Sequence, residues 1–185
     1  MKKLSILILA SVLILLSVPH VFAQALTISP TPTPTPIPTS VDYDLPYPGL
    51  LPGNPLYDIK VLRDRIESFF ISDPLKRAEF SLLQSDKRLS AGVMLFDEGQ
   101  YDRAESTISK GEKYMQDSLN QATALKEKGQ TADPLLQKIN LSSQKHVEVI
   151  KNLEKKASLD ISKRLDVSLN MAEETSKKAK EESLK

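Results

Sequence analysis

The chain has 185 residues, with 25 basic and 24 acidic side chains and a formal net charge of +1. This length allows one domain with appendages, and the balanced charge provides no basic field to attract nucleic acid or an anionic membrane. Cysteine is absent, which excludes disulfide bonds, thiolate metal sites, cysteine nucleophiles and lipid attachment at a cysteine. Aromatic residues make up only 5% of the chain, which favours helices over a β-sandwich or barrel.

Residues 1–23 are typical of a secretory signal peptide. Two lysines precede an uncharged apolar run from Leu4 to Val18, and small residues follow, up to Ala23. An uncleaved anchor is the alternative, because Leu4 to Phe22 is just long enough to span a bilayer. Both interpretations predict that the rest of the chain is extracytoplasmic, whether secreted, periplasmic or on the cell surface. An uncleaved segment would then be its only membrane contact.

Residues 24–52 predict an extended linker. Proline alternates with other residues from Ser29 to Thr39, which removes backbone donors and favours polyproline II over helix. We expect a spacer, with an O-glycosylated stalk as the alternative. Further prolines continue the extended segment as far as Pro52.

Residues 53–176 predict an all-α domain, an antiparallel bundle of four to five amphipathic helices. Proline after a capping residue marks helix starts and glycine marks helix ends; these signals are Asn54-Pro55, Asp73-Pro74 and Asp133-Pro134 for the starts, and Gly99 and Gly129 for the ends. A fifth helix is expected to begin at Ser158 or Asp160. The charged residues 177–185 are expected to fray.

Apolar residues recur at spacings of three and four along each predicted helix. In the first helix they are Ile59, Leu62, Ile66 and Phe69. Such narrow stripes need partners, and the short connections make neighbouring helices antiparallel. The sequence therefore predicts that these stripes are buried against one another.

Three motifs carry a resemblance to a known family. Residues 51–60, with Pro55, Leu56, Tyr57 and Lys60, resemble the opening element of an uncharacterised prokaryotic family, the domain of unknown function DUF5667. Lys87-Arg88-Leu89 resembles an R-L pair of that family, and residues 145–150, which contain His146, resemble its K-H-x-x-V-L stretch.

The resemblance covers about residues 51–178. Gly92 and Val93 stand where family members often continue with Ala and Glu. The family implies a helical fold and supplies no established function.

Two groups of residues are candidates for a functional site, and each has a structural alternative. His146 lies on the predicted apolar stripe of the fourth helix, where packing in the core is favoured over a role as a pH sensor. Pro55, Leu56, Tyr57 and Lys60 could form a docking element, but a packed helix start is favoured. Arg88 enters through the family resemblance.

No constellation for catalysis, for a cofactor or for a metal is found in the sequence. We therefore expect a non-enzymatic extracytoplasmic helical module that contacts an envelope or secreted protein, or a cell-surface polymer. The alternative is a sensor or ligand-binding bundle that responds to a small ligand, or to pH near 6 through His146.

Overall fold

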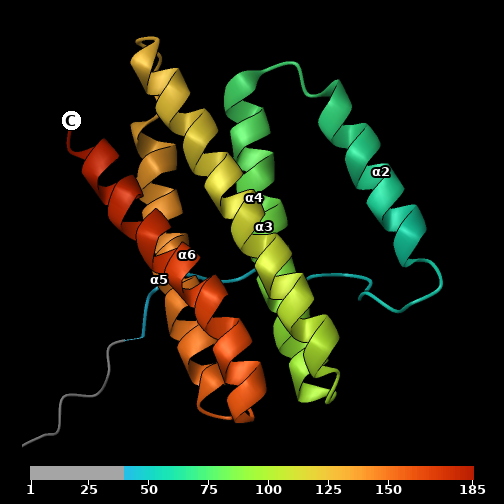
Figure 1. The fold of residues 1–185 in the computed structure, drawn as a ribbon. Coiled ribbons are helices and arrows are strands. Elements are labelled where there is room, and N and C mark those ends of the chain that lie inside the picture. The colour runs from blue at the N-terminus through green and yellow to red at the C-terminus, as the bar shows by residue number, and fades with distance from the viewer. Residues whose placement is uncertain (1–39) are drawn as a thin grey trace, which may run out of the picture. The chain divides into compact units, whose positions relative to one another are not determined.

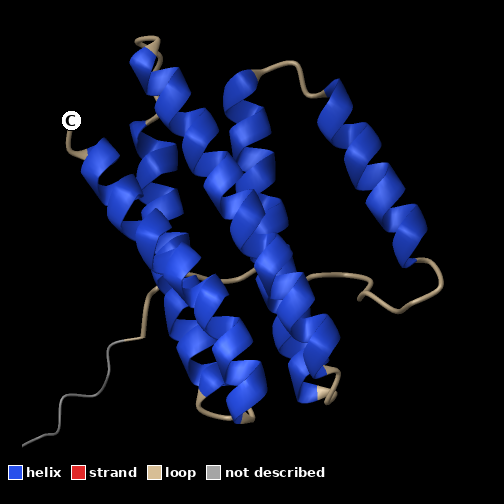
Figure 2. Cartoon of the chain, in the orientation of Figure 1, coloured by secondary structure: helices blue, strands red, loops and turns tan. Residues whose placement is uncertain are grey.

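The computed structural model describes residues 40–185, which belong to one compact unit. The predicted signal segment and the Pro/Thr repeat lie outside the described residues. Within this range the chain forms helices and no strand (Figures 1 and 2), which confirms the all-α fold class. The helices are α2 (Tyr57–Phe70), α3 (Pro74–Asp97), α4 (Tyr101–Glu127), α5 (Asp133–Glu154) and α6 (Leu159–Ser183). None of these five helices is long and apolar enough to cross a bilayer.

The predicted punctuation is confirmed at the start of α3 and at the ends of α3 and α4. At the starts of α2 and α5 the predicted capping residues are wrong, because the N-caps are Leu56 and Ala132 and neither makes a side-chain capping bond. Asp73 accepts hydrogen bonds from the backbone N–H groups of Leu75 (2.8 Å) and Lys76, with Pro74 in the first turn of α3. Gly99 ends α3 with a φ of 76°. There the Gln100 N–H donates to the Leu95 carbonyl (2.8 Å), as in a Schellman motif. A left-handed glycine also ends α4, at Gly129.

Helices α3 to α6 form the bundle, in which α3 packs mainly on α4 and α5 mainly on α6 (Figure 1). Their buried apolar side chains form two separate clusters, one containing Leu82 and Met115 and the other containing Leu89 and Ile150. Buried polar residues lie between these positions along the helices. The core is therefore divided by a polar layer near its middle.

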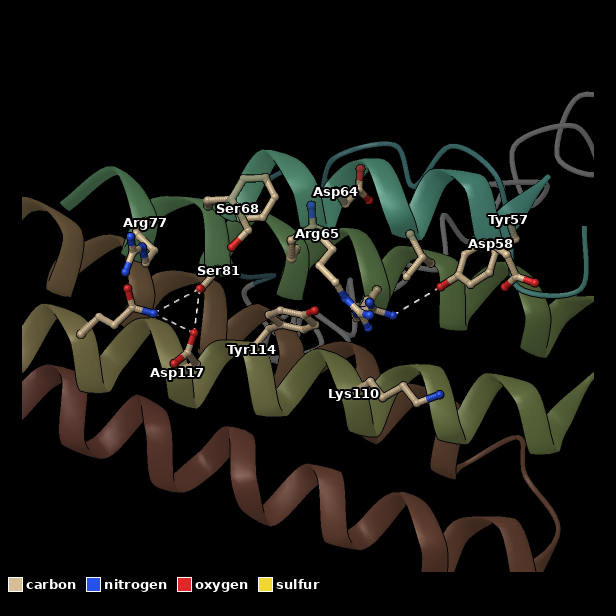
Figure 3. Close-up of a pocket in the computed structure, with 15 residues that line it drawn as sticks. Tyr57, Asp58, Asp64, Arg65, Ser68, Arg77, Ser81, Lys110, Tyr114 and Asp117 are labelled. Atoms are coloured by element: carbon tan, nitrogen blue, oxygen red, sulfur yellow. Dashed lines mark hydrogen bonds between the residues drawn. The ribbon is translucent and has the colours of Figure 1, made fainter. Parts of the chain in front are cut away.

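Helix α2 departs from the predicted packing. It has no buried residue, and its apolar stripe is exposed; we call Ile59, Leu62, Ile66 and Phe69 the outer face of α2, with Phe69 81% exposed. The expectation that this stripe is covered by the bundle is wrong. The residues of α2 that line the space between this helix, α3 and α4 are instead mostly polar (Figure 3).

Both ends of the predicted domain also differ from expectation. Residues 40–52 contain no helix, as predicted, but they lie against the bundle, where Leu45 and Leu51 pack on the second apolar cluster. At the other end, α6 continues past residue 176 to Ser183, and Ala179 is fully buried in the first cluster. The residues expected to fray thus contribute to the core, because Ala179 lies on the inner side of the otherwise charged end of α6.

Candidate functional site

The polar layer consists of Asp86 on α3, Glu112 on α4, and Ser142 and His146 on α5, all buried. The imidazole bridges the two carboxylates, with Nδ1 2.7 Å from Glu112 Oε1 and Nε2 3.1 Å from Asp86 Oδ1. The Ser142 hydroxyl donates to the same Asp86 oxygen at 2.5 Å. Buried polar groups are tolerated when they are paired in this way. The layer therefore links three of the four bundle helices.

The two carboxylates determine the charge of His146. Burial alone would lower its pKa, but Glu112 and Asp86 outweigh that effect and raise the pKa to about 9. The imidazole is thus protonated at neutral pH, and both of its ring nitrogens donate hydrogen bonds. His146 lies in the core as the favoured interpretation predicts, but as a charged member of a network rather than as an apolar substitute.

The polar layer also anchors the segment that precedes α2. The Tyr43 hydroxyl donates to Asp86 Oδ2 at 2.6 Å, and burial together with Asp86 raises the pKa of Tyr43. Nearby, the Val41 N–H donates to Glu148 Oε2 at 2.7 Å, a contact that lowers the pKa of Glu148. Residues 41–45 alternate between half-buried and exposed positions, as an extended chain with one face on the bundle does.

A pocket with a volume of about 430 Å³ lies between α2, α3 and α4; we call it the Arg88 pocket (Figure 3). The Arg88 guanidinium lies over the ring of Tyr114, 4.9 Å from its centroid, and donates a hydrogen bond of 3.3 Å to the Tyr57 hydroxyl. The other residues used below, which also line it, are Asp58, Val61, Asp64, Arg65, Phe80, Ser81, Gln84, Lys110, Asp117 and Gln121.

The structure brings some of the predicted site residues together. Tyr57, Lys60 and Arg88 are neighbours, with Lys60 Nζ 5.6 Å from the Tyr57 ring centroid and 3.0 Å from the Pro48 carbonyl oxygen. Pro55 and Leu56 are exposed, so the expectation of a packed helix start is wrong for these two residues. His146 belongs to the separate polar layer.

The sequence does not indicate the partners of His146. Asp86 and Glu112 come from two other helices, and nothing in the spacing of one helix indicates which carboxylates of another it will meet. A signal was nonetheless present for α5, where Ser142, Ser143 and His146 interrupt the apolar stripe between Ile139 and Ile150. A polar gap of this kind on an inner face indicates a buried polar layer.

The fold and the buried network define a helical-bundle protein in which α2, the first helix among the described residues, keeps its apolar face outside the core. Residues 49–160 match a family described as Domain of unknown function (DUF5667). The chain belongs to this family, as the three motifs predict. The matched range includes Tyr57, Arg88 and His146, and ends at the start of α6. No curated protein and no solved structure matches the chain.

Proposed function

We propose that the chain is a non-enzymatic, extracytoplasmic helical module that binds another protein of the cell envelope, and that α2 is the element that makes the contact. The supporting observation is the outer face of α2. Ile59, Leu62, Ile66 and Phe69 are all at least half exposed, whereas the bundle helices bury their apolar stripes. Contiguous exposed apolar side chains mark interaction sites.

The chemistry of α2 favours a protein groove as the partner surface. The spacing 59, 62, 66 and 69 provides the anchors that an amphipathic helix inserts into an apolar groove. Helix α2 contains three basic residues and three acidic ones. This balance supplies no attraction to an anionic membrane or to nucleic acid. We therefore expect the partner to present an apolar groove, with no large excess of positive or negative charge around it.

Site-specific photo-crosslinking in the native envelope tests this proposal on the full chain. A photoreactive residue replaces either Leu62 on α2 or Leu141, an exposed leucine on α5. We expect one discrete protein product from position 62 that is missing from position 141. Adding Ile66→Asp should remove this product, because a charge cannot enter an apolar groove without a large desolvation cost.

Direct binding then separates a partner from a bystander. The captured protein, purified, should bind the purified full chain, and Ile66→Asp should weaken binding at least tenfold while Leu141→Asp leaves it unchanged. Equal products from both positions would contradict the proposal. So would products that contain only lipid or only a second copy of the chain.

The second candidate function is a bundle that responds to pH through His146. Its support is the buried bridge to Glu112 and Asp86. The raised pKa of about 9 moves the expected response from near pH 6 to alkaline pH. Unfolding curves between pH 6 and pH 10 test this candidate: a transition near pH 9 that His146→Gln removes would support it, and a profile without such a transition would contradict it.

A further inference from the structure

The Arg88 pocket lies on the opposite side of α2 from the outer face and has the size of a small-molecule site. Its volume is about 430 Å³, within the range of pockets that bind small ligands. Three helices supply its walls, as Figure 3 shows for Tyr57 and Arg65 on α2 and for Lys110 and Tyr114 on α4. Residues from three successive helices therefore converge on one cavity.

Three carboxylates line this pocket, those of Asp58, Asp64 and Asp117. Asp64 Oδ1 pairs with the Arg63 guanidinium at 2.6 Å, so it has its own counter-ion. Asp117 Oδ2 accepts hydrogen bonds from Ser81 (2.8 Å) and Gln121 (2.7 Å), which occupy this oxygen but leave its charge in place. Asp58 is exposed in the first turn of α2.

Three of the cations that line the pocket form no ion pair with a carboxylate of the described chain. Arg65, Arg88 and Lys110 have no carboxylate oxygen within 4 Å among residues 40–185, although all three line the cavity. Arg65 and Lys110 are exposed and stay solvated, whereas Arg88 is half-buried, where a cation without a counter-ion is costly. Arg88 is therefore the cation of this pocket that gains most from a bound anion.

Arg88 is the best placed of these cations. Its guanidinium lies over the ring of Tyr114 and makes a single long hydrogen bond to Tyr57, while its Nε is buried and has no partner among the described residues. A guanidinium offers five donors in a planar fork that matches a carboxylate. The contacts with the two tyrosines restrain the Arg88 side chain, so less rotamer freedom is lost when an anion binds.

The remaining walls suit an organic body rather than a bare ion. Val61 and Phe80 add apolar surface, and Gln84, which is only 6% exposed, makes no side-chain hydrogen bond within the described residues. An amide that lines a cavity without a partner in the protein can donate to or accept from a polar group of a ligand. A molecule with a carboxylate and an apolar ring fits both parts of the lining.

We propose that the Arg88 pocket binds a small organic carboxylate, with the Arg88 guanidinium as the recognition group for the carboxylate and the walls formed by α2 and α4 enclosing its apolar body. This site goes beyond the proposed protein-binding role, since it uses the inner side of α2 and requires no partner protein. It assigns α2 two separate faces with two separate ligands.

Isothermal titration calorimetry of the full chain with benzoate tests the proposal. Benzyl alcohol serves as the uncharged analogue and inorganic phosphate as the anion without an apolar body. We expect benzoate to bind at least tenfold more tightly than either compound. Arg88→Gln should weaken benzoate binding at least tenfold, and Arg88→Lys should restore only part of it, because a lysine lacks the planar fork.

The matched control is Arg103→Gln, which removes an exposed arginine of α4 that bonds Gln100 outside the pocket. This variant should bind benzoate like the wild type, and melting curves should show both glutamine variants folded. No measurable benzoate binding would overturn the proposal. Equal affinity for benzyl alcohol, tighter binding of phosphate, or equal losses in the two glutamine variants would also overturn it.

Discussion

His146 Nδ1 lies 2.7 Å from Glu112 Oε1, and both side chains are fully buried. This pair joins α5 to α4, so it connects the hairpin of α3 and α4 with the hairpin of α5 and α6. The apolar contacts on either side are not directional. A single charged pair between them has only one satisfied arrangement, so we infer that it fixes the register of the two hairpins.

Replacing His146 with Leu should destabilise the fold strongly. The change leaves Asp86 and Glu112 buried without their shared cation, and breaking a buried ion pair from one side costs about 3–5 kcal/mol. Urea unfolding followed by far-ultraviolet circular dichroism measures the loss. A cost below about 1 kcal/mol would contradict the buried bridge.

A compensating variant separates the charge from the packing. Glu112→Met combined with His146→Leu removes the charge and its partner together, while Asp86 keeps the donors Tyr43 and Ser142. We expect the double variant to be more stable than His146→Leu alone, because an apolar pair is cheaper than an unpaired buried carboxylate.

The stability of the wild type should fall as the pH rises through about 9. His146 titrates near 6.5 when unfolded and at about 9 when folded, so its contribution is complete below pH 6.5 and is lost as the pH passes the folded value. The expected loss in the free energy of unfolding is on the order of 3 kcal/mol. His146→Gln should lack this alkaline slope in urea unfolding measured from pH 6 to pH 10.

Tyr43→Phe should loosen the segment before α2. The phenol donates to a carboxylate at 2.6 Å, and removing a hydrogen bond to a charged group costs about 1.5–3 kcal/mol. Tyr47→Phe is the matched control, since Tyr47 is 76% exposed and should be neutral. Faster proteolysis at residues 40–48 in the first variant, with no change in the second, is the expected readout. Equal behaviour would contradict the anchor.

Gly92→Ala should destabilise the α3–α4 contact, although alanine is the better helix former. A Cβ at this position would lie 2.3 Å from Ile108 Cγ1, and overpacking typically costs about 1–3 kcal/mol. In an Ile108→Ala background the same substitution should become neutral or stabilising, which thermal unfolding measures.

The two phenylalanines Phe69 and Phe96 should respond oppositely to replacement by Ser. Phe69 is 81% exposed on α2, whereas Phe96 is 6% exposed in the second apolar cluster. The first change should be within about 0.5 kcal/mol of the wild type, as for ordinary surface substitutions. The second should cost about 3 kcal/mol or more. A large decrease in the free energy of unfolding for Phe69→Ser, measured with urea, would contradict the exposed position of Phe69.

Most of the fold follows from local signals in the sequence. Capping by Asp73 and the left-handed glycines Gly99 and Gly129 define helix boundaries through backbone chemistry within a few residues, so a single segment is enough to predict them. The bundle then follows because the stripes of α3 to α6 have no other way to leave water.

The orientation of α2 and the partners of His146 could not be predicted in the same way. An apolar stripe indicates that a helix face will be covered, but not whether this chain or another molecule covers it. Asp86 and Glu112 lie 60 and 34 residues from His146, and their meeting depends on how two hairpins align. Tertiary register of this kind is not encoded in the period of any one helix.

The anchoring of Tyr43 has a mechanical consequence. Asp86 lies at the middle of α3, so Tyr43 attaches the segment before α2 to the middle of the bundle rather than to a helix end. Tension applied through the N-terminal part of the chain would load the bonds of Tyr43 and Val41 before it reached α2. These contacts would therefore bear the force first, and the helices would not be unfolded turn by turn from one end while the contacts hold.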